Sequence, residues 1–253
     1  MDGQTGVQPP ERPLPRPLQR HSAARTAVVW DALAGVLAGA DLSVVDVGGG
    51  TGGFAVRAAE LGHRVTVVDP SPDALAILSR RAEESGVADR VTGRQGDMAS
   101  VAELLPAGSA DVVLCHGVLE IVEDPTASLH TLAGVLRPGG TLSLLVAQRH
   151  AAVLARAMAV HFAQARTLLD GTEPGPGGLR RFTPGEVRDL LAGCGFGVDS
   201  MRAVRVFADL VPSSLLDLEP GAAQALVELE QAVATRPEYL PLAAQVHALA
   251  TRG

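Results

Sequence analysis

The sequence contains no lysine, and all 21 of its basic residues are arginine. Together with 28 glycines and 17 prolines, this absence is typical of a compositional bias in the source genome and says little about function. The 28 acidic residues give a formal net charge of -7. An acidic total argues against extensive non-specific binding of nucleic acids, although it leaves room for a local basic patch.

Cysteines and long apolar segments are also scarce. The two cysteines, Cys115 and Cys194, lie far apart and match no metal-ligand spacing, so we predict a reduced protein without a metal site. No apolar run approaches the roughly 18 residues of a membrane span, and the first twenty residues lack the apolar core of a signal peptide. These features predict a cytoplasmic protein.

The first forty residues contain a proline-rich segment followed by a helical pattern. Residues 1–20 carry five prolines and few apolar residues, which predicts a disordered leader. A helical pattern begins near residue 22 and runs through AARTAVVWDALAGVL with one apolar stripe. The remaining chain is long enough for one sizeable domain, so we expect residues 21–253 to form a single unit.

Strand and helix patterns then alternate. Apolar runs predict strands at 43–47, 64–68, 91–94, 111–115 and 141–147, and helical patterns lie between them at 54–61, 72–85 and 126–136. Near-continuous apolar strands joined by helices predict a doubly wound α/β fold with a mostly parallel sheet, because helices cover both of its faces.

The second half of the chain adds further elements. A helical pattern at 150–169 and a glycine- and proline-rich loop predict a helical insertion with a substrate-side loop at about 150–182. A helix follows that is capped near Thr183 and has Pro184 in its first turn. Beyond it we expect a strand at 197–207, a helix in GAAQALVELEQAVA and a last strand in AAQVHALAT.

A glycine-rich turn in VVDVGGGTGGF (residues 44–54) joins the first strand to the next helix. Glycines there free the backbone N–H groups and the positive helix end for a ligand that approaches closely. Asp69 ends the second strand about twenty residues later, where an acidic side chain can accept both hydroxyls of a ribose. These two features alone allow a nicotinamide or flavin enzyme as well as an enzyme with another nucleoside cofactor.

Two later motifs narrow the choice. GRQGDMAS places Asp97 where a carboxylate can bond an adenine amino group and Met98 where it can pack on the ring, and LRPGG leads into the fifth strand. In order and spacing these motifs resemble those of class I S-adenosylmethionine-dependent methyltransferases, across about residues 43–147. The resemblance implies a Rossmann-like sheet with an antiparallel C-terminal strand and S-adenosylmethionine as cofactor. A dehydrogenase that uses NAD is the weaker alternative.

Flanking segments carry a closer resemblance. AARTAVVWDALAGVL, CHGVLEIVEDP, VRVFADL, LVELEQAV and RPEYLPLAAQVHALA look like the bacterial tRNA 5-carboxymethoxyuridine methyltransferases, which esterify a carboxylate on the wobble base. The resemblance implies a set of cofactor-binding residues: Arg25, Gly48, Gly49, Gly50, Asp69, Asp97, Met98 and His116. Arg25 suits the cofactor's carboxylate because its guanidinium can bond two oxygens at once.

The expected reaction, methyl transfer, does not require a protein side chain to form a covalent bond with the substrate. Methyl transfer is an in-line displacement, so the protein has to align the nucleophile and exclude water. A carboxylate nucleophile is already ionised near pH 7 and needs no general base. The sequence shows no evident catalytic dyad, and we name no catalytic residue.

The acceptor stays open at this point. A candidate basic strip for tRNA consists of Arg149, Arg156, Arg166, Arg180 and Arg181, but the segment LLDGTEPGPGGLRR also carries two acidic residues. Three functions are compatible with the sequence: a tRNA methyltransferase, a small-molecule O- or N-methyltransferase, and a cofactor-binding protein without transfer activity.

Overall fold

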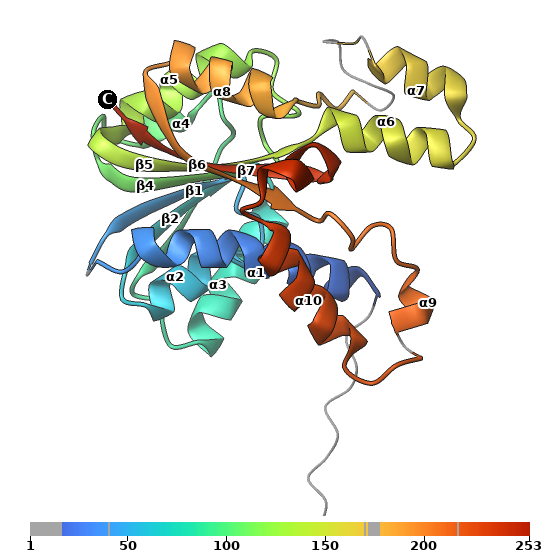
Figure 1. Ribbon diagram of the computed structural model, residues 1–253. Coiled ribbons are helices and arrows are strands. Elements are labelled where there is room, and N and C mark those ends of the chain that lie inside the picture. The colour runs from blue at the N-terminus through green and yellow to red at the C-terminus, as the bar shows by residue number, and fades with distance from the viewer. Residues whose placement is uncertain (1–16, 40, 170, 172–177, 217) are drawn as a thin grey trace, which may run out of the picture.

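The computed structural model describes residues 17–39, 41–169, 171, 178–216 and 218–253. Its chain alternates helices and strands around one seven-stranded sheet with the order β3-β2-β1-β4-β5-β7-β6 (Figure 1). The strands are β1 (Ser43–Val47), β2 (Arg64–Asp69), β3 (Val91–Gln95), β4 (Ala110–His116), β5 (Leu136–Ala147), β6 (Phe196–Val204) and β7 (Gln245–Arg252). Strands β1 to β5 pair in parallel, and β7 is antiparallel to both β5 and β6. The predicted fold class is therefore confirmed.

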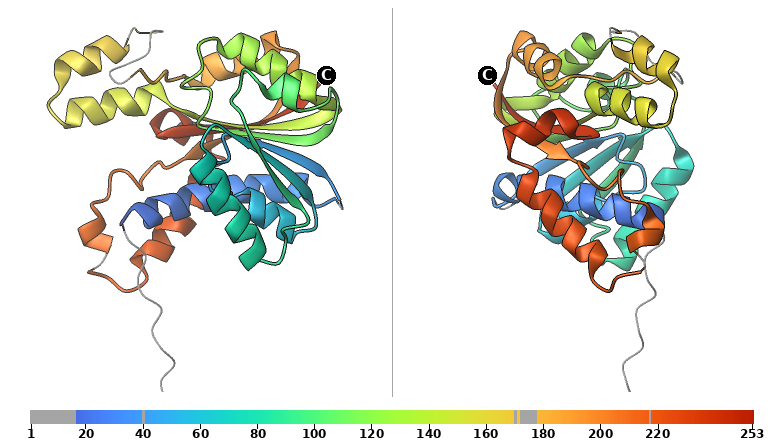
Figure 2. Two further views of the ribbon diagram at one scale, coloured as in Figure 1. Left: turned by 180° about the vertical axis from the view of Figure 1, so that it is seen from behind. Right: turned by 45° about the vertical axis from the view of Figure 1, so that its right-hand side comes forward.

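Helices cover both faces of the sheet, as Figures 1 and 2 show. One face packs against α1 (Pro17–Val36), α2 (Ala55–Glu60) and α3 (Pro72–Glu84). The other face packs against α4 (Val101–Leu104), α5 (Pro125–Val135) and α8 (Pro184–Gly193). Because both faces are covered, the central strands are buried along nearly their whole length, which explains their continuous apolar sequences.

Local sequence sets where several helices begin. At α8 the Thr183 hydroxyl accepts the Glu186 N–H, the Glu186 carboxylate accepts the Thr183 N–H, and Pro184 occupies the first turn, as predicted. At α5 the Asp124 carboxylate accepts two N–H groups of the first turn. These caps fix the helices at the edge of the sheet where the strands end.

Four helical elements complete the chain: α6 (Arg149–Met158), α7 (Phe162–Leu169), α9 (Ser213–Leu216) and α10 (Ala222–Val233), followed by the 3-10 helix η1 (Pro237–Leu242). Helices α6 and α7 project beyond the body of the sheet (Figure 1). No helix in the part of the chain that the structure describes is long and apolar enough to cross a membrane.

Some predicted boundaries are wrong. Helix α1 begins at Pro17, within the proposed leader, whose residues 1–16 lie outside the described residues. The predicted helix 150–169 is two helices, because Val160 adopts a left-handed conformation (φ 62°) that no helix interior accepts. The strand predicted at 197–207 ends at Val204, because Arg205 is also left-handed (φ 61°). Most of the predicted substrate-side loop, residues 170 and 172–177, lies outside the described residues.

Candidate functional site

The glycine-rich turn connects β1 to α2 and is tied to β2. Gly48 (φ 71°) and Gly50 (φ 56°) adopt left-handed conformations that favour glycine. The Gly48 N–H donates to the Val68 carbonyl (2.7 Å), and the Gly50 N–H donates to Asp69 Oδ2 (2.8 Å). A Cβ atom on Gly48 would overlap the Val118 side chain, and one on Gly49 would lie 2.5 Å from Asp46 Oδ2. These two glycines are thus required by the protein's own packing, before any ligand is considered.

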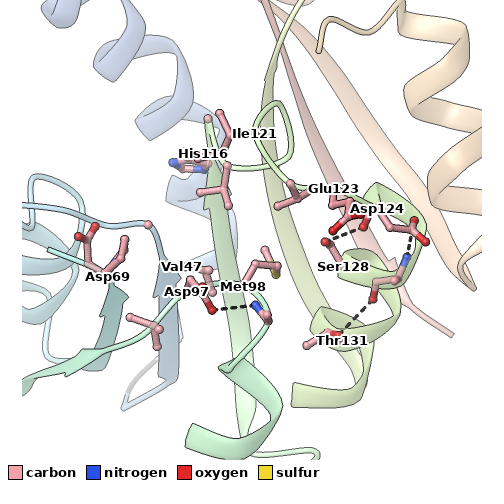
Figure 3. Close-up of a pocket in the computed structure, with 18 residues that line it drawn as sticks. Val47, Asp69, Asp97, Met98, His116, Ile121, Glu123, Asp124, Ser128 and Thr131 are labelled. Atoms are coloured by element: carbon pink, nitrogen blue, oxygen red, sulfur yellow. Dashed lines mark hydrogen bonds between the residues drawn. The ribbon is translucent and has the colours of Figure 1, made fainter. Parts of the chain in front are cut away.

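A cavity of about 630 Å³ opens beside this turn at the carboxyl ends of β1, β2 and β4 (Figure 3). Five predicted residues line it: Gly48, Asp69, Asp97, Met98 and His116. The opposite wall is formed by residues 117, 118 and 121–124, which follow β4, and by the first turns of α5. The carboxyl edge of an open parallel sheet is where such folds bind ligands.

Acidic side chains dominate the polar lining of this cavity, which we call the acidic cavity. Asp69, Asp97, Glu123 and Asp124 belong to its lining, whereas no arginine does within the described residues. Asp69 is 8% exposed, and its two oxygens accept the N–H groups of Gly50 and Ser71 (2.8 and 2.9 Å). A carboxylate has about four acceptor sites, so Asp69 retains capacity for ligand hydroxyls.

The other three predicted residues, Gly49, Gly50 and Arg25, do not belong to the lining of this cavity. Gly50 holds the Asp69 carboxylate, and Gly49 lies over Asp46. Arg25 on α1 has a buried Nε without a hydrogen-bond partner among the described residues. Burial lowers the pKa of Arg25, as does the nearby Arg205, while Glu120 and Asp46 oppose that change. Arg25 therefore lies near both acidic and basic side chains, and its Nε–H has no hydrogen-bond acceptor among the described residues.

Two acidic residues near Arg25 were missed in the sequence. Asp46 is 3% exposed, and burial raises its pKa to about 7, with Asp69 adding to the effect and Arg25 opposing it. Glu120 accepts the Ala147 N–H (2.7 Å), and its Oε2 is buried without a partner among the described residues. Burial likewise raises the pKa of Glu120, against its hydrogen bonds and Arg25. The signal was present for Asp46, which is the only charged residue of β1.

His116, which lines the cavity, belongs to a chain of three polar side chains, and the other two, Ser143 and His247, are fully buried. Its Nε2 lies 2.8 Å from the Ser143 hydroxyl, which lies 2.8 Å from His247 Nε2. Burial lowers the pKa of His116 well below its ordinary value, with further contributions from His247 and Arg25. Burial also lowers the pKa of His247, to about 3. His116 is therefore neutral near pH 7 and adds no positive charge to the acidic cavity.

A second cavity, of about 370 Å³, lies further along the same sheet edge. Ala147 at the end of β5, Gln245 at the start of β7, helix α6 and the segment after β6 contribute to its lining. Its basic side chains are Arg181 and Arg205, and its one described acidic side chain, Asp209, is already bonded to Arg205 (2.5 Å). We call it the basic cavity.

The candidate basic strip is only partly assembled. Arg149, Arg180 and Arg181 line one small surface hollow, and Arg156 lowers the pKa of Arg181 after the larger effect of burial. Arg149, however, pairs with Glu186 (2.8 Å), so its charge is partly neutralised. The structure does not join Arg166, which is exposed on α7, to the others. No cluster of metal-ligating side chains occurs in the described ranges.

Comparisons with known proteins agree on the family. Residues 45–144 match the "Methyltransferase domain" family. The chain is 31% identical to the tRNA 5-carboxymethoxyuridine methyltransferase of Escherichia coli K12, over 90% of this chain and 88% of that protein. It is 39% identical to the ubiquinone biosynthesis O-methyltransferase of Xanthomonas euvesicatoria pv. vesicatoria, but over only 54% of this chain and 55% of that one.

A solved structure supports the fold. The S-adenosylmethionine-dependent methyltransferase from Mesorhizobium loti superimposes with a TM-score of 0.60 and 19% identity, covering 92% of this chain and all of that one. At that identity the likeness concerns the fold alone, whereas the relative from Escherichia coli matches across nearly the whole sequence. The chain therefore belongs to the class I S-adenosylmethionine-dependent methyltransferases and, among them, to the family that includes the tRNA 5-carboxymethoxyuridine methyltransferases.

Proposed function

We propose that this methyltransferase esterifies a carboxylate, and that the carboxylate is carried by a modified wobble uridine in tRNA. The observation that supports it most directly is the pairing of two cavities of opposite charge along one sheet edge. The acidic cavity suits a cofactor with a positively charged sulfur, and the basic cavity suits an acceptor with a negatively charged carboxylate.

The residues of the acidic cavity fit the cofactor. S-adenosylmethionine supplies a methyl group on a sulfonium, which makes that methyl electrophilic. Asp69 would hold the ribose hydroxyls, Asp97 and Met98 the adenine, and the Gly48 turn the methionine part. The buried Arg25 Nε, which has no partner in the described structure, suits the cofactor's carboxylate. Neutral His116 avoids repulsion of a cationic ligand.

Each of the two arginines that line the basic cavity, Arg181 and Arg205, has a second arginine nearby. Arg25 and Arg205 repel each other, as do Arg156 and Arg181, which contributes to the lowered pKa values of Arg25 and Arg181. An acceptor carboxylate in the basic cavity, beside Arg181 and Arg205, would relieve part of that repulsion. It is ionised near pH 7, so the site needs to position it and exclude water, and the reaction requires no general base.

Support for tRNA comes from where the relatives align. The tRNA-modifying relative matches 90% of the chain, which must include much of the region outside residues 45–144 where the basic cavity is built. The ubiquinone-pathway relative matches about half of the chain. Arg180 and Arg181, which both line the small hollow, would contact phosphates of the tRNA.

A small-molecule O-methyltransferase is the second candidate. The observation in its favour is the limited basic strip, since Arg149 is paired with Glu186 and the total charge is -7. A small carboxylic acid would occupy the basic cavity without any contact to phosphates.

The deciding experiment incubates the purified chain with methyl-labelled cofactor and either total tRNA or a metabolite extract. We expect label in tRNA, in a nucleoside whose mass corresponds to the methyl ester of 5-carboxymethoxyuridine. Label only in the metabolite fraction would refute the tRNA assignment and favour the second candidate.

A pair of charge reversals tests the contact with tRNA. Arg181→Glu should weaken tRNA methylation at least tenfold and reduce its dependence on salt, because a phosphate or carboxylate contact is lost. Arg80→Glu is the matched control, since Arg80 is exposed on α3, away from the basic cavity, in an ion pair with Glu84. Equal effects of both variants would contradict the assignment of Arg181.

A further inference from the structure

Three segments that lie outside residues 45–144, the part of the chain that matches the methyltransferase family, meet beside the basic cavity. They are the loop at residues 205–209 after β6, helix α10, and the 3-10 helix η1 with the residues that follow it. Ala203, Val206, Val233 and Ala243 form a small buried cluster there. The rings of Phe207 and Tyr239 pack edge to face at 6.0 Å. The loop is therefore supported from behind, while Arg205, Val206 and Phe207 line the cavity.

A buried carboxylate lies at the centre of this support. Glu230 on α10 is fully buried and accepts three consecutive backbone N–H groups of the loop. Val206 donates to Oε2 (2.9 Å), and Phe207 and Ala208 donate to Oε1 (both 2.8 Å). Burying a charge is costly unless hydrogen bonds satisfy it, and charged acceptors make the stronger hydrogen bonds. The loop thus wraps around one carboxylate and takes its shape from it.

The residue just before these three donors is conformationally strained. Arg205 has a φ of 61°, a left-handed conformation that is unfavourable for a residue with a side chain. Its carbonyl accepts the Ala244 N–H (3.0 Å), and its guanidinium contacts Asp209 through Nε (3.0 Å) and a terminal nitrogen (2.5 Å). Strain of this kind persists only where the surroundings fix the backbone, and it is common at ligand sites.

We propose that Glu230 is a positioning residue for the acceptor: it holds the loop so that Arg205 presents the part of its guanidinium that Asp209 does not bind to the acceptor's carboxylate in the basic cavity. This role rests on the proposed carboxylate acceptor. Glu230 itself touches neither cofactor nor acceptor, because it is fully buried behind the loop and belongs to neither cavity's lining.

The chemistry requires a carboxylate at position 230. Glutamine has nearly the same volume but one acceptor oxygen, and its amide NH₂ would face a backbone N–H of the loop. At least one of the three N–H groups would then be left buried without an acceptor. The loop would relax, and Arg205 would lose its fixed place at the cavity wall.

Glu230→Gln tests the proposal, with Glu228→Gln as the matched control. Glu228 lies on the same helix, is exposed, and accepts a hydrogen bond from Gln224 (3.0 Å). For the carboxylate acceptor that the wild-type chain methylates, Glu230→Gln should raise KM about tenfold or more, whereas Glu228→Gln should leave it unchanged. The Kd of the cofactor should change less than twofold in both, because the acidic cavity is untouched. An unchanged KM in Glu230→Gln would overturn the proposal.

A double-variant comparison separates positioning from general stability. If Glu230 acts through Arg205, Glu230→Gln should change KM less than twofold when added to Arg205→Ala. Multiplication of the two effects would overturn the proposal. Should Glu230→Gln fail to fold, Glu230→Asp keeps the charge but withdraws it by one methylene, and the same KM criteria apply to it.

The result also separates this proposal from the function on which it rests. If the wild-type chain methylates a small carboxylic acid instead of tRNA, the tRNA assignment fails while the Glu230 test proceeds with that acid. If it methylates only acceptors without a carboxylate, both fail.

Discussion

Replacing Gly48 by alanine tests whether the glycine-rich turn is shaped by the protein's own packing. The residue has a φ of 71°, and an added Cβ would overlap the Val118 side chain across the acidic cavity's edge. Gly53 in the same turn offers a control, because it does not have a positive φ and its added Cβ would meet nothing within 4 Å.

The expected cost of Gly48→Ala can be worked from two contributions. A left-handed conformation costs a residue with a side chain about 1–2 kcal/mol. Overpacking against Val118 adds about 1–3 kcal/mol. The variant should therefore lose at least about 2 kcal/mol, shared between the free energy of unfolding and the free energy of cofactor binding, depending on how far the turn relaxes.

Two measurements together capture that loss. Denaturant unfolding gives the change in folding free energy, and titration calorimetry with S-adenosylmethionine or its demethylated product gives the change in Kd. If the turn relaxes fully, Kd should rise by about tenfold for each 1.4 kcal/mol released from strain. Gly53→Ala should change both quantities little. If Gly48→Ala matched Gly53→Ala in stability and in affinity, the role assigned to this turn would be refuted.

Three further predictions concern buried polar groups. Asp69→Ala should raise the cofactor Kd at least tenfold by calorimetry, since it removes the carboxylate that orders Gly50 and faces the acidic cavity, while Asp73→Ala, exposed on α3, should not. Burial raises the pKa of Asp46 from 3.8 to about 7, so the folded state keeps a proton that the unfolded state releases, and the contribution of Asp46 to stability falls as pH rises from about 4 to about 7. The free energy of unfolding of Asp46→Asn, relative to that of the wild type, should therefore rise across that pH window by roughly 4 kcal/mol at most. Unfolding titrations without cofactor measure it, and a difference between the two proteins that does not change with pH would contradict the raised pKa of Asp46. Ser143→Ala should cost about 1–3 kcal/mol for each imidazole nitrogen left unpaired, and an unchanged unfolding midpoint would show that the buried chain is not formed.

Local patterns in the sequence were sufficient for the sheet and for much of the acidic cavity. The strands of the parallel core are apolar throughout because helices cover both faces, so their order in the chain reveals the α/β class. Gly48, Asp69, Asp97 and His116 each follow or end a strand, and parallel strands bring their carboxyl ends to one edge.

Other features needed the tertiary structure because they depend on contacts between distant segments. In the sequence, Glu230 is a charged residue of a predicted helix with no sign of burial. Its hydrogen bonds to the backbone of residues 206–208 are visible only in the folded chain. Likewise, the paired state of Arg149 could not be inferred, because Glu186 lies on a later helix.

The amino-acid sequence by itself determined the fold class and five residues of the acidic cavity's lining, since hydrophobic periodicity indicates the strands and these residues lie at or near strand ends. Only the tertiary structure decided which arginines line the basic cavity and that the Glu230 carboxylate holds the loop at residues 205–209. The physical reason is that burial and hydrogen bonding there depend on contacts between segments that are far apart in the sequence, namely β5, β6, β7 and α10.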